Sequence, residues 1–278
     1  MKNILKIMLM MITIYTIAGS AVYAAEIPVS DQDQLITSSD WTEISNLQDE
    51  MKKEEPDATI DYDKALKVYV DCNLIKLQTA DTKKLTSALE SANYVWVIPF
   101  KMEKTYGMFT VAKGLPLSEE AKSVLTKAEQ EEVKNHAGKW MITETAEHTV
   151  EPYYDILLEK REALSDCTRV VLVGSQPGMR QPVALGMDDE TARIWISLGY
   201  QYPVMEKIPE TQNVESGVYS FDSVAEISDT YIEDSEVSTG AGVQSRSSMK
   251  YVAGIGIIVI GSILILSVLK KKKLEDYE

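Results

Sequence analysis

The segment nearest to a catalytic motif is Gly174-Ser175-Gln176-Pro177-Gly178, which follows an apolar run at residues 170–173. A serine nucleophile needs a general base beside it, and the histidines of the chain are His136 and His148. The segment lacks the Gly-x-Ser-x-Gly elbow, and Pro177 hinders a helix directly behind Ser175. A tight turn between two strands explains the same residues, so we favour the turn over the nucleophile.

Paired carboxylates are the next candidates, because they hold calcium in loop sites. Asp31-x-Asp33 and Asp61-x-Asp63 resemble the start of a calcium loop, but neither continues with glycine at position six or glutamate at position twelve. The run Asp188-Asp189-Glu190 fits a hairpin turn. The sequence also contains no phosphate-binding glycine loop and no dinucleotide motif. We therefore expect no metal and no cofactor.

Arg180 is an isolated cation on a proline-flanked loop of an acidic chain. Arginine on a stiff loop suits a carboxylate or a partner protein. Pairing with an acid of the same domain explains the residue as well and is the interpretation that we favour. Arg180 is thus a weak candidate for ligand binding.

The two cysteines, Cys72 and Cys167, both adjoin apolar runs. With no Cys-x-x-Cys pair and no third cysteine, a structural zinc site is excluded. In an oxidising compartment the two residues can pair. A bridge across about 95 residues stabilises a fold by about 4–5 kcal/mol. The alternative is two buried free thiols. The two interpretations are nearly balanced, and we slightly favour the disulfide bridge.

The elements that would position these residues follow from apolar spacing. Alternating or continuous apolar runs predict strands at residues 66–72, 94–100, 108–112, 140–143, 170–173, 182–187 and 192–198. Three helices begin at Asp81, Ser118 and Pro152. The helix at residues 118–133 is expected to bury Ala121, Val124, Leu125 and Ala128. This mixed order favours an α+β fold with a mostly antiparallel or mixed sheet over a doubly wound parallel one.

Residues 25–250, which lie between the two apolar runs at the ends of the sequence, divide into three segments. Residues 25–55 contain one amphipathic helix, capped by Ser39 or Asp40, whose narrow apolar face carries Trp41, Ile44 and Met51. This helix is expected to pack on the domain from outside. Residues 56–204 form the compact ectodomain. Residues 205–250 are acidic and lack an apolar period, which predicts a disordered stalk with two short apolar islands.

The two ends of the sequence predict the topology. Residues 1–24 have the positive start, short apolar core and small terminal residues of a signal peptide. Residues 251–269 form an apolar run long enough to span a bilayer, and the tail at residues 270–278 opens with four lysines. Gly254 and Gly261 share one face of this helix and are candidate contacts for another helix. We expect a single-pass plasma-membrane protein with its domain outside the cell and its short tail in the cytoplasm.

The net charge of the chain limits the classes of partner that it can bind. The chain carries −15 at pH 7, and residues 25–250 alone carry −18. Such a surface repels nucleic acid and anionic lipid head groups, so no nucleic-acid partner is expected. The composition of the two ends is typical of a bacterial source.

These observations predict a membrane-anchored, non-enzymatic extracytoplasmic interaction domain that binds a protein or other ligand at the cell surface. One alternative is an accessory subunit of a membrane complex, docking through its transmembrane helix and stalk. The other is an extracytoplasmic hydrolase that uses Ser175 and one histidine.

Overall fold

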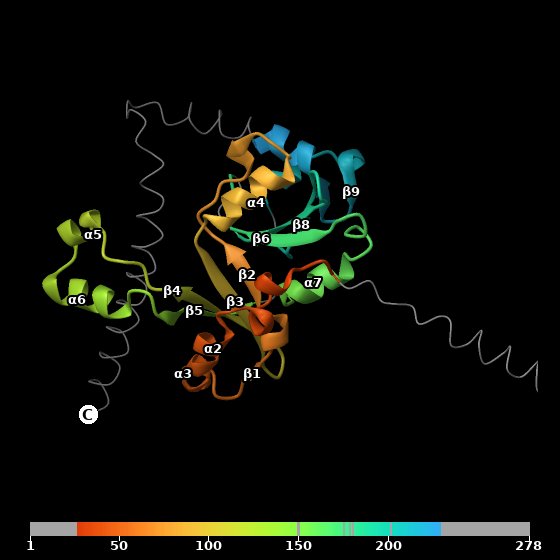
Figure 1. Ribbon diagram of the computed structural model, residues 1–278. Coiled ribbons are helices and arrows are strands. Elements are labelled where there is room, and N and C mark those ends of the chain that lie inside the picture. Colours follow the sequence, from red (N-terminus) through yellow and green to blue (C-terminus); the bar gives the residue numbers. More distant parts are fainter. Residues whose placement is uncertain are drawn as a thin grey trace, which may run out of the picture.

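The computed structural model describes residues 27–148, 151–174, 176–177, 179, 181–200 and 202–228. These residues form an α+β domain around one mostly antiparallel sheet, which confirms the expected class (Figure 1). The strand order is β5-β4-β3-β2-β6-β7-β8-β10-β9, with the short β1 paired to β3. Among the described strands, β2 and β6 are the pair that runs parallel.

Seven strands, β2 to β8, lie close to the apolar runs that predict them, whereas β1, β9 and β10 were not predicted. They are β1 (Thr59–Ile60), β2 (Leu66–Tyr69), β3 (Tyr94–Lys101), β4 (Tyr106–Lys113), β5 (Trp140–His148), β6 (Arg169–Val173), β7 (Val183–Met187), β8 (Ala192–Ser197), β9 (Asn213–Glu215) and β10 (Val218–Ser220). The strand at the predicted residues 66–72 is shorter than expected, and β5 continues five residues beyond the predicted 140–143.

The helices are more numerous than the four expected, which are the amphipathic helix of residues 25–55 and three helices in the ectodomain. They are α2 (Trp41–Ile44), α3 (Gln48–Glu54), α4 (Thr82–Glu90), α5 (Glu119–Val124), α6 (Lys127–His136) and α7 (Tyr153–Glu159). The caps predicted at Asp81 and Ser118 are confirmed, since both side chains accept backbone N–H bonds. The helix expected at residues 118–133 is two helices, because Leu125 is extended and Thr126 starts a new capped helix.

The sheet consists of two halves that meet at one short pairing. Strands β2 and β6 pair only through Val68 with Leu172 and Tyr69 with Val173. Beside this pairing the N-terminal segment lies between the two strands, since Val29 bridges to Val170 and Gln34 to Leu66. We call residues 27–40 the clasp, because they contact both halves of the sheet.

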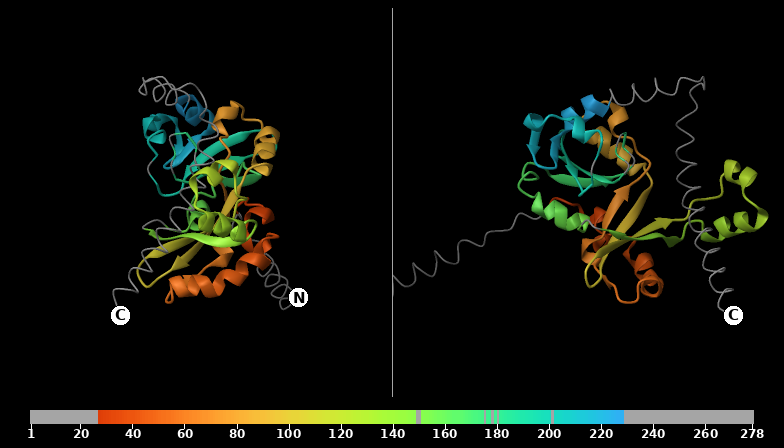
Figure 2. Two further views of the ribbon diagram at one scale, coloured as in Figure 1. Left: turned by 90° about the vertical axis from the view of Figure 1, so that its left-hand side faces the viewer. Right: turned by 180° about the vertical axis from the view of Figure 1, so that it is seen from behind.

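Both faces of the sheet are covered. On one face, Tyr153 and Leu157 of α7 pack on the centre of the sheet. On the other face, α4 and the helical residues 221–228 cover the β6–β8 half. On that same face, α2 and α3 cover β3 and β4. Figures 1 and 2 show these two groups of helices at opposite ends of the molecule.

The expectation that the first amphipathic helix packs from outside is wrong. Ile44 and Met51 are fully buried against Trp96 and Phe109. A 3₁₀ turn at Ser45–Leu47 separates α2 from α3 and keeps both helices on the sheet. The narrow apolar stripe is therefore core, because it is what covers the aromatic residues of β3 and β4.

The expected domain boundary at residue 204 is also wrong. Val218 is buried on the α7 face of the sheet, Phe221 and Val224 are buried on the α4 face, and β10 pairs with β8. The two apolar islands of the predicted stalk thus belong to the domain, which reaches at least Ser228. They escape a periodicity test because each is only a few residues long. The rest of the predicted stalk lies outside the described residues.

The predicted membrane elements cannot be compared with the fold. The signal peptide at residues 1–24, the apolar run at residues 251–269 with Gly254 and Gly261, and the tail at residues 270–278 all lie outside the described residues. Within the described part of the chain, no helix has the length and apolarity needed to cross a bilayer. The topology stays a prediction from the sequence.

Candidate functional site

Residues 114–139, inserted between β4 and β5, carry α5 and α6 away from the sheet. We call this insertion the arm; Figures 1 and 2 show it projecting from the rest of the domain. No residue of the arm whose exposure is described is buried. The expected burial of Ala121, Val124, Leu125 and Ala128 is therefore wrong, and the side chain of Val124 is 66% exposed.

The arm is ordered by its own polar contacts. Ser118 Oγ accepts a hydrogen bond from the Ala121 N–H at 3.1 Å and so caps α5. At the start of α6, Thr126 and Glu129 form a reciprocal capping box. These bonds to Thr126 lower the pKa of Glu129. Gln130 Nε2 donates to the carbonyls of Lys122 and Leu125, at 3.0 and 2.9 Å, and ties α6 to α5.

The base of the arm is closed by backbone hydrogen bonds. The Gly114 N–H donates to the Lys139 carbonyl at 2.9 Å, and the Gly138 N–H donates to the Gly114 carbonyl at 2.8 Å. Gly138 has a φ of +76°, which glycine adopts without strain. The arm is therefore a self-contained unit joined to the sheet at one point.

The surface of the arm differs from that of the domain. It exposes two large apolar side chains, Leu115 at 46% and Val124 at 66%. Its four lysines and five glutamates give a net charge of −1, whereas residues 25–250 together carry −18. An ordered, nearly neutral element with exposed apolar side chains suits protein contact better than the acidic surface around it.

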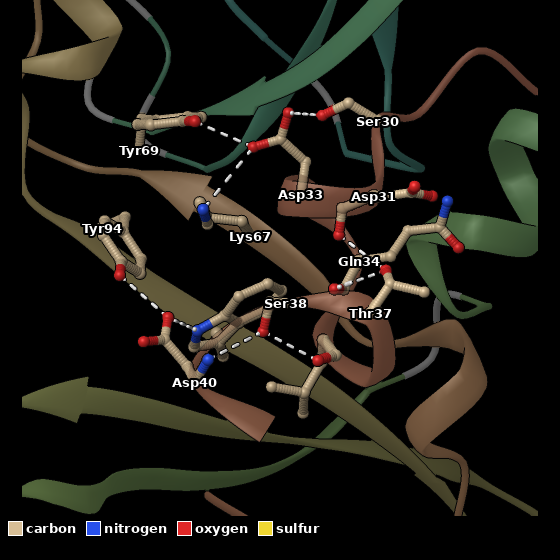
Figure 3. A network of polar contacts seen from close by, with 12 residues as sticks. Ser30, Asp31, Asp33, Gln34, Thr37, Ser38, Asp40, Lys67, Tyr69 and Tyr94 are labelled. Atoms are coloured by element: carbon tan, nitrogen blue, oxygen red, sulfur yellow. Dashed lines mark hydrogen bonds and ion pairs between the residues drawn. The ribbon is translucent and has the colours of Figure 1, made fainter. Parts of the chain in front are cut away.

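A second cluster of functional groups lies where the clasp meets the two half-sheets (Figure 3). The carboxylate of Asp33, whose side chain is 3% exposed, accepts a hydrogen bond from Arg169 at 2.9 Å. It also accepts one from Tyr69 at 2.8 Å, which Figure 3 shows. Ser30 Oγ donates to the same carboxylate at 2.6 Å, and Lys67 Nζ lies 3.8 Å from it. Asp33 thus joins β2, β6 and the clasp.

Lys67 sits in an aromatic enclosure on the same face. Its Nζ lies 4.5 Å from the ring centre of Tyr94, 5.3 Å from that of Trp96 and 5.9 Å from that of Tyr69. Burial lowers the pKa of Lys67, and the neighbouring Asp33 opposes that shift. Burial, reinforced by Asp33, raises the pKa of Tyr69. The rings and the carboxylate together compensate the buried cation.

Asp40 has a different role from the predicted helix cap. Its side chain makes no capping bond to α2. Instead its carboxylate accepts hydrogen bonds from the Tyr94 hydroxyl at 2.8 Å and Trp96 Nε1 at 3.0 Å (Figure 3). Asp33 and Asp40 therefore fasten the middle and the C-terminal end of the clasp to the sheet, and we assign the cluster a structural role.

The predicted nucleophile and ligand-binding residue cannot be placed. Ser175, Gly178 and Arg180 lie outside the described residues. Their neighbour Gln176 is buried and binds the 72–74 segment, donating to the Cys72 carbonyl at 2.6 Å and accepting from the Leu74 N–H at 3.0 Å. Of the two candidate bases, His136 ends α6 on the arm. His148 ends β5.

At least one carboxylate of each candidate group has a partner within the protein. Asp33 is held by Arg169 and Lys67, and Asp61 lies 3.7 Å from Lys64. Asp188 Oδ1 accepts the N–H groups of Glu190 and Thr191 at 2.8 and 2.6 Å, as expected of a hairpin turn. These bonds lower the pKa of Asp188. Among the described residues, no group of three or more potential ligands is placed to hold a metal ion.

The predicted disulfide is wrong, because both cysteines are free thiols on opposite faces of the sheet. Cys72 packs against the core below α4. Cys167 lies on the α7 face, where a Cβ added at Gly186 would come within 2.8 Å of its Sγ. Burial raises the pKa of Cys72 to about 12 and that of Cys167 to about 11. The alternative of two free thiols holds.

A shallow cleft of about 260 Å³ lies between residues 75–80 and the helical residues 221–228. Its walls include Ile75, Gln78 and Phe221. Gln78 adopts a left-handed conformation, with a φ of +48°. None of the sequence candidates lines this cleft.

The arm and the Asp33 cluster are the two features that sequence reasoning missed. Asp33 stands out in the sequence only through its calcium-like spacing with Asp31, which does not indicate a buried ion pair. Lys67 has the pattern of any solvent-facing residue of an alternating strand. No protein-family model, curated protein or solved structure matches this chain.

Proposed function

We propose that this chain is a membrane-anchored, non-enzymatic extracytoplasmic domain that binds a protein partner at the cell surface, with the arm as its principal contact. The arm is the observation that carries this proposal. Ordering a backbone costs about 1–2 kcal/mol per residue, and the arm buries none of its described side chains to offset that cost. A partner that covers Leu115 and Val124 would supply the missing burial.

The internal contacts of the arm support the same role. The caps of α5 and α6 and the amide of Gln130 hold the two helices together before any partner arrives. A preorganised element loses less entropy on binding than a flexible loop does. The location rests on the predicted signal peptide and on the apolar run at residues 251–269, which would hold the domain outside the membrane.

Site-specific photo-crosslinking tests this proposal. A photoreactive amino acid replaces Val124 on the arm in the full chain, and a matched variant carries it at Val214 on β9, which is 56% exposed. In intact cells we expect one discrete cross-linked protein from position 124 and none from position 214. Equal cross-linking at both positions, or none at position 124, would contradict the proposal. A cross-linked integral membrane protein would favour the accessory-subunit form of it.

A further inference from the structure

Strand β5 ends the sheet on the side of the arm. Within the described residues it pairs with β4 and with no other strand. No backbone hydrogen bond of another described element reaches its outer side. An edge strand of nine residues presents a row of unpaired N–H and C=O groups, which is a template for an added strand.

A bulge divides this edge into two parts. The pairing of β4 with β5 shifts register between Thr110 and Val111, where Thr143 Oγ1 donates to the Thr110 carbonyl at 3.1 Å. Bulges protect edges against unwanted pairing. Beyond the bulge, residues 144–148 pair one to one with residues 110–106 of β4. This regular half of β5 is the part able to accept a strand.

The regular half is acidic on both sides of the sheet. Glu144 and Glu147 are exposed and, being three residues apart, point to opposite faces. Glu54 adds a third carboxylate by accepting a hydrogen bond from the Thr145 hydroxyl. In the described part of the molecule, none of these glutamates takes part in an ion pair.

We propose that residues 144–148 of β5 bind an extended, basic segment of the partner protein as an added strand. Main-chain hydrogen bonds supply the pairing, and lysine or arginine on both faces of the segment meets Glu144 and Glu147. A second copy of β5 is disfavoured as the occupant, because it would bring its own glutamates against these two. This inference rests on the proposed function and names the chemistry of the partner.

Hydrogen exchange on the full chain in detergent micelles tests the inference. The probe is a capped peptide as long as β5, made of threonine and valine with lysine at every third position, which matches the spacing of Glu144 and Glu147. A control peptide carries glutamate at the lysine positions. We expect the lysine peptide to slow exchange at alternate amides of residues 144–148 and the glutamate peptide to leave them unchanged.

Charge-reversal variants test whether the two glutamates contribute to the affinity for the lysine peptide. The double variant Glu144→Lys and Glu147→Lys should weaken binding of the lysine peptide by roughly tenfold, since each exposed charge pair contributes less than about 1 kcal/mol. The control variant Glu90→Lys and Glu210→Lys makes the same change of net charge at exposed positions on α4 and just before β9, at the other end of the sheet from β5, and should bind like the unaltered chain.

Three outcomes would overturn the inference. They are unchanged exchange of residues 144–148 at saturating lysine peptide, equal slowing by both peptides, and slow exchange in the chain alone that is relieved by dilution. The last result would identify a second copy as the occupant. If cross-linking at position 124 persists while β5 fails this test, the inference falls and the proposed function stands.

Discussion

The clasp and the arm both lie outside the main strands of the sheet, and the fold places them in opposite environments. The clasp lies between the two halves of the sheet and buries Leu35 and Asp33 completely or nearly so. The arm has a clearer helical pattern, yet it projects into solvent. Helical periodicity shows that a face is apolar, but it does not show whether the same chain covers that face.

The largest expected effect concerns the clasp. Asp33→Asn keeps the shape of the side chain and removes the carboxylate that faces both Arg169 and Lys67. Breaking a buried ion pair at one partner leaves an uncompensated charge, so the free energy of unfolding should fall by about 3–5 kcal/mol. Urea unfolding of the domain within the full chain measures this loss.

The control for that change is Asp31→Asn, at an exposed position two residues away. It should alter the free energy of unfolding by less than about 0.5 kcal/mol. If the two variants were equally stable, the Asp33 cluster would not hold the half-sheets together.

Two substitutions that shorten an apolar side chain, one beside the clasp and one on the arm, compare how far the two segments pack on the domain. Ile44→Ala removes a fully buried side chain just after the clasp and should lower the free energy of unfolding by about 2–4 kcal/mol. Val124→Ala removes an exposed side chain of the arm and should change it by less than about 0.5 kcal/mol. Equal losses would mean that the arm packs on the domain in solution.

Alkaline pH should weaken the clasp by a smaller amount. The pKa of Tyr69 and that of Tyr94 are raised by burial, so the folded state favours their protonated forms. Their contribution is complete below pH 10 and declines as the pH rises above that value. The lowered pKa of Lys67 acts in the opposite direction and offsets part of the loss.

The double variant Tyr69→Phe and Tyr94→Phe isolates this contribution. From about pH 9 to about pH 11, the unaltered chain should lose about 1–2 kcal/mol more than the variant does. Urea unfolding at each pH gives the difference. The arm contains no tyrosine or cysteine, so the hydrogen exchange of α5 and α6, corrected for intrinsic rate, should not follow this loss.

Much of the sheet was predictable, because β3, β6, β7 and β8 are apolar runs that end at turn residues. The clasp was not, because Asp33 and Lys67 become interior groups only when residues far apart in sequence meet. The end of the domain was misplaced for a related reason. Phe221 and Val224 sit in an acidic segment whose average composition hides them.

The candidate site was the harder part to predict. The arm carries caps at Ser118 and Thr126 that the sequence displays, and one of them was predicted. The spacing of Val124 and Leu125 could not reveal that the described chain leaves Val124 exposed and Leu125 only partly covered. The edge of β5 likewise depends on the order of strands, which local patterns do not contain.

The most direct test of the role of the arm is its replacement. Residues 115–137 are exchanged for a two-residue Asn-Gly turn, because Gly114 and Gly138 already meet through a backbone hydrogen bond. Affinity purification of the full chain from cross-linked cells should then lose the partner protein, while the free energy of unfolding changes by less than about 1 kcal/mol. Undiminished recovery of the partner with a folded variant would contradict the account, and so would a loss of stability of several kcal/mol.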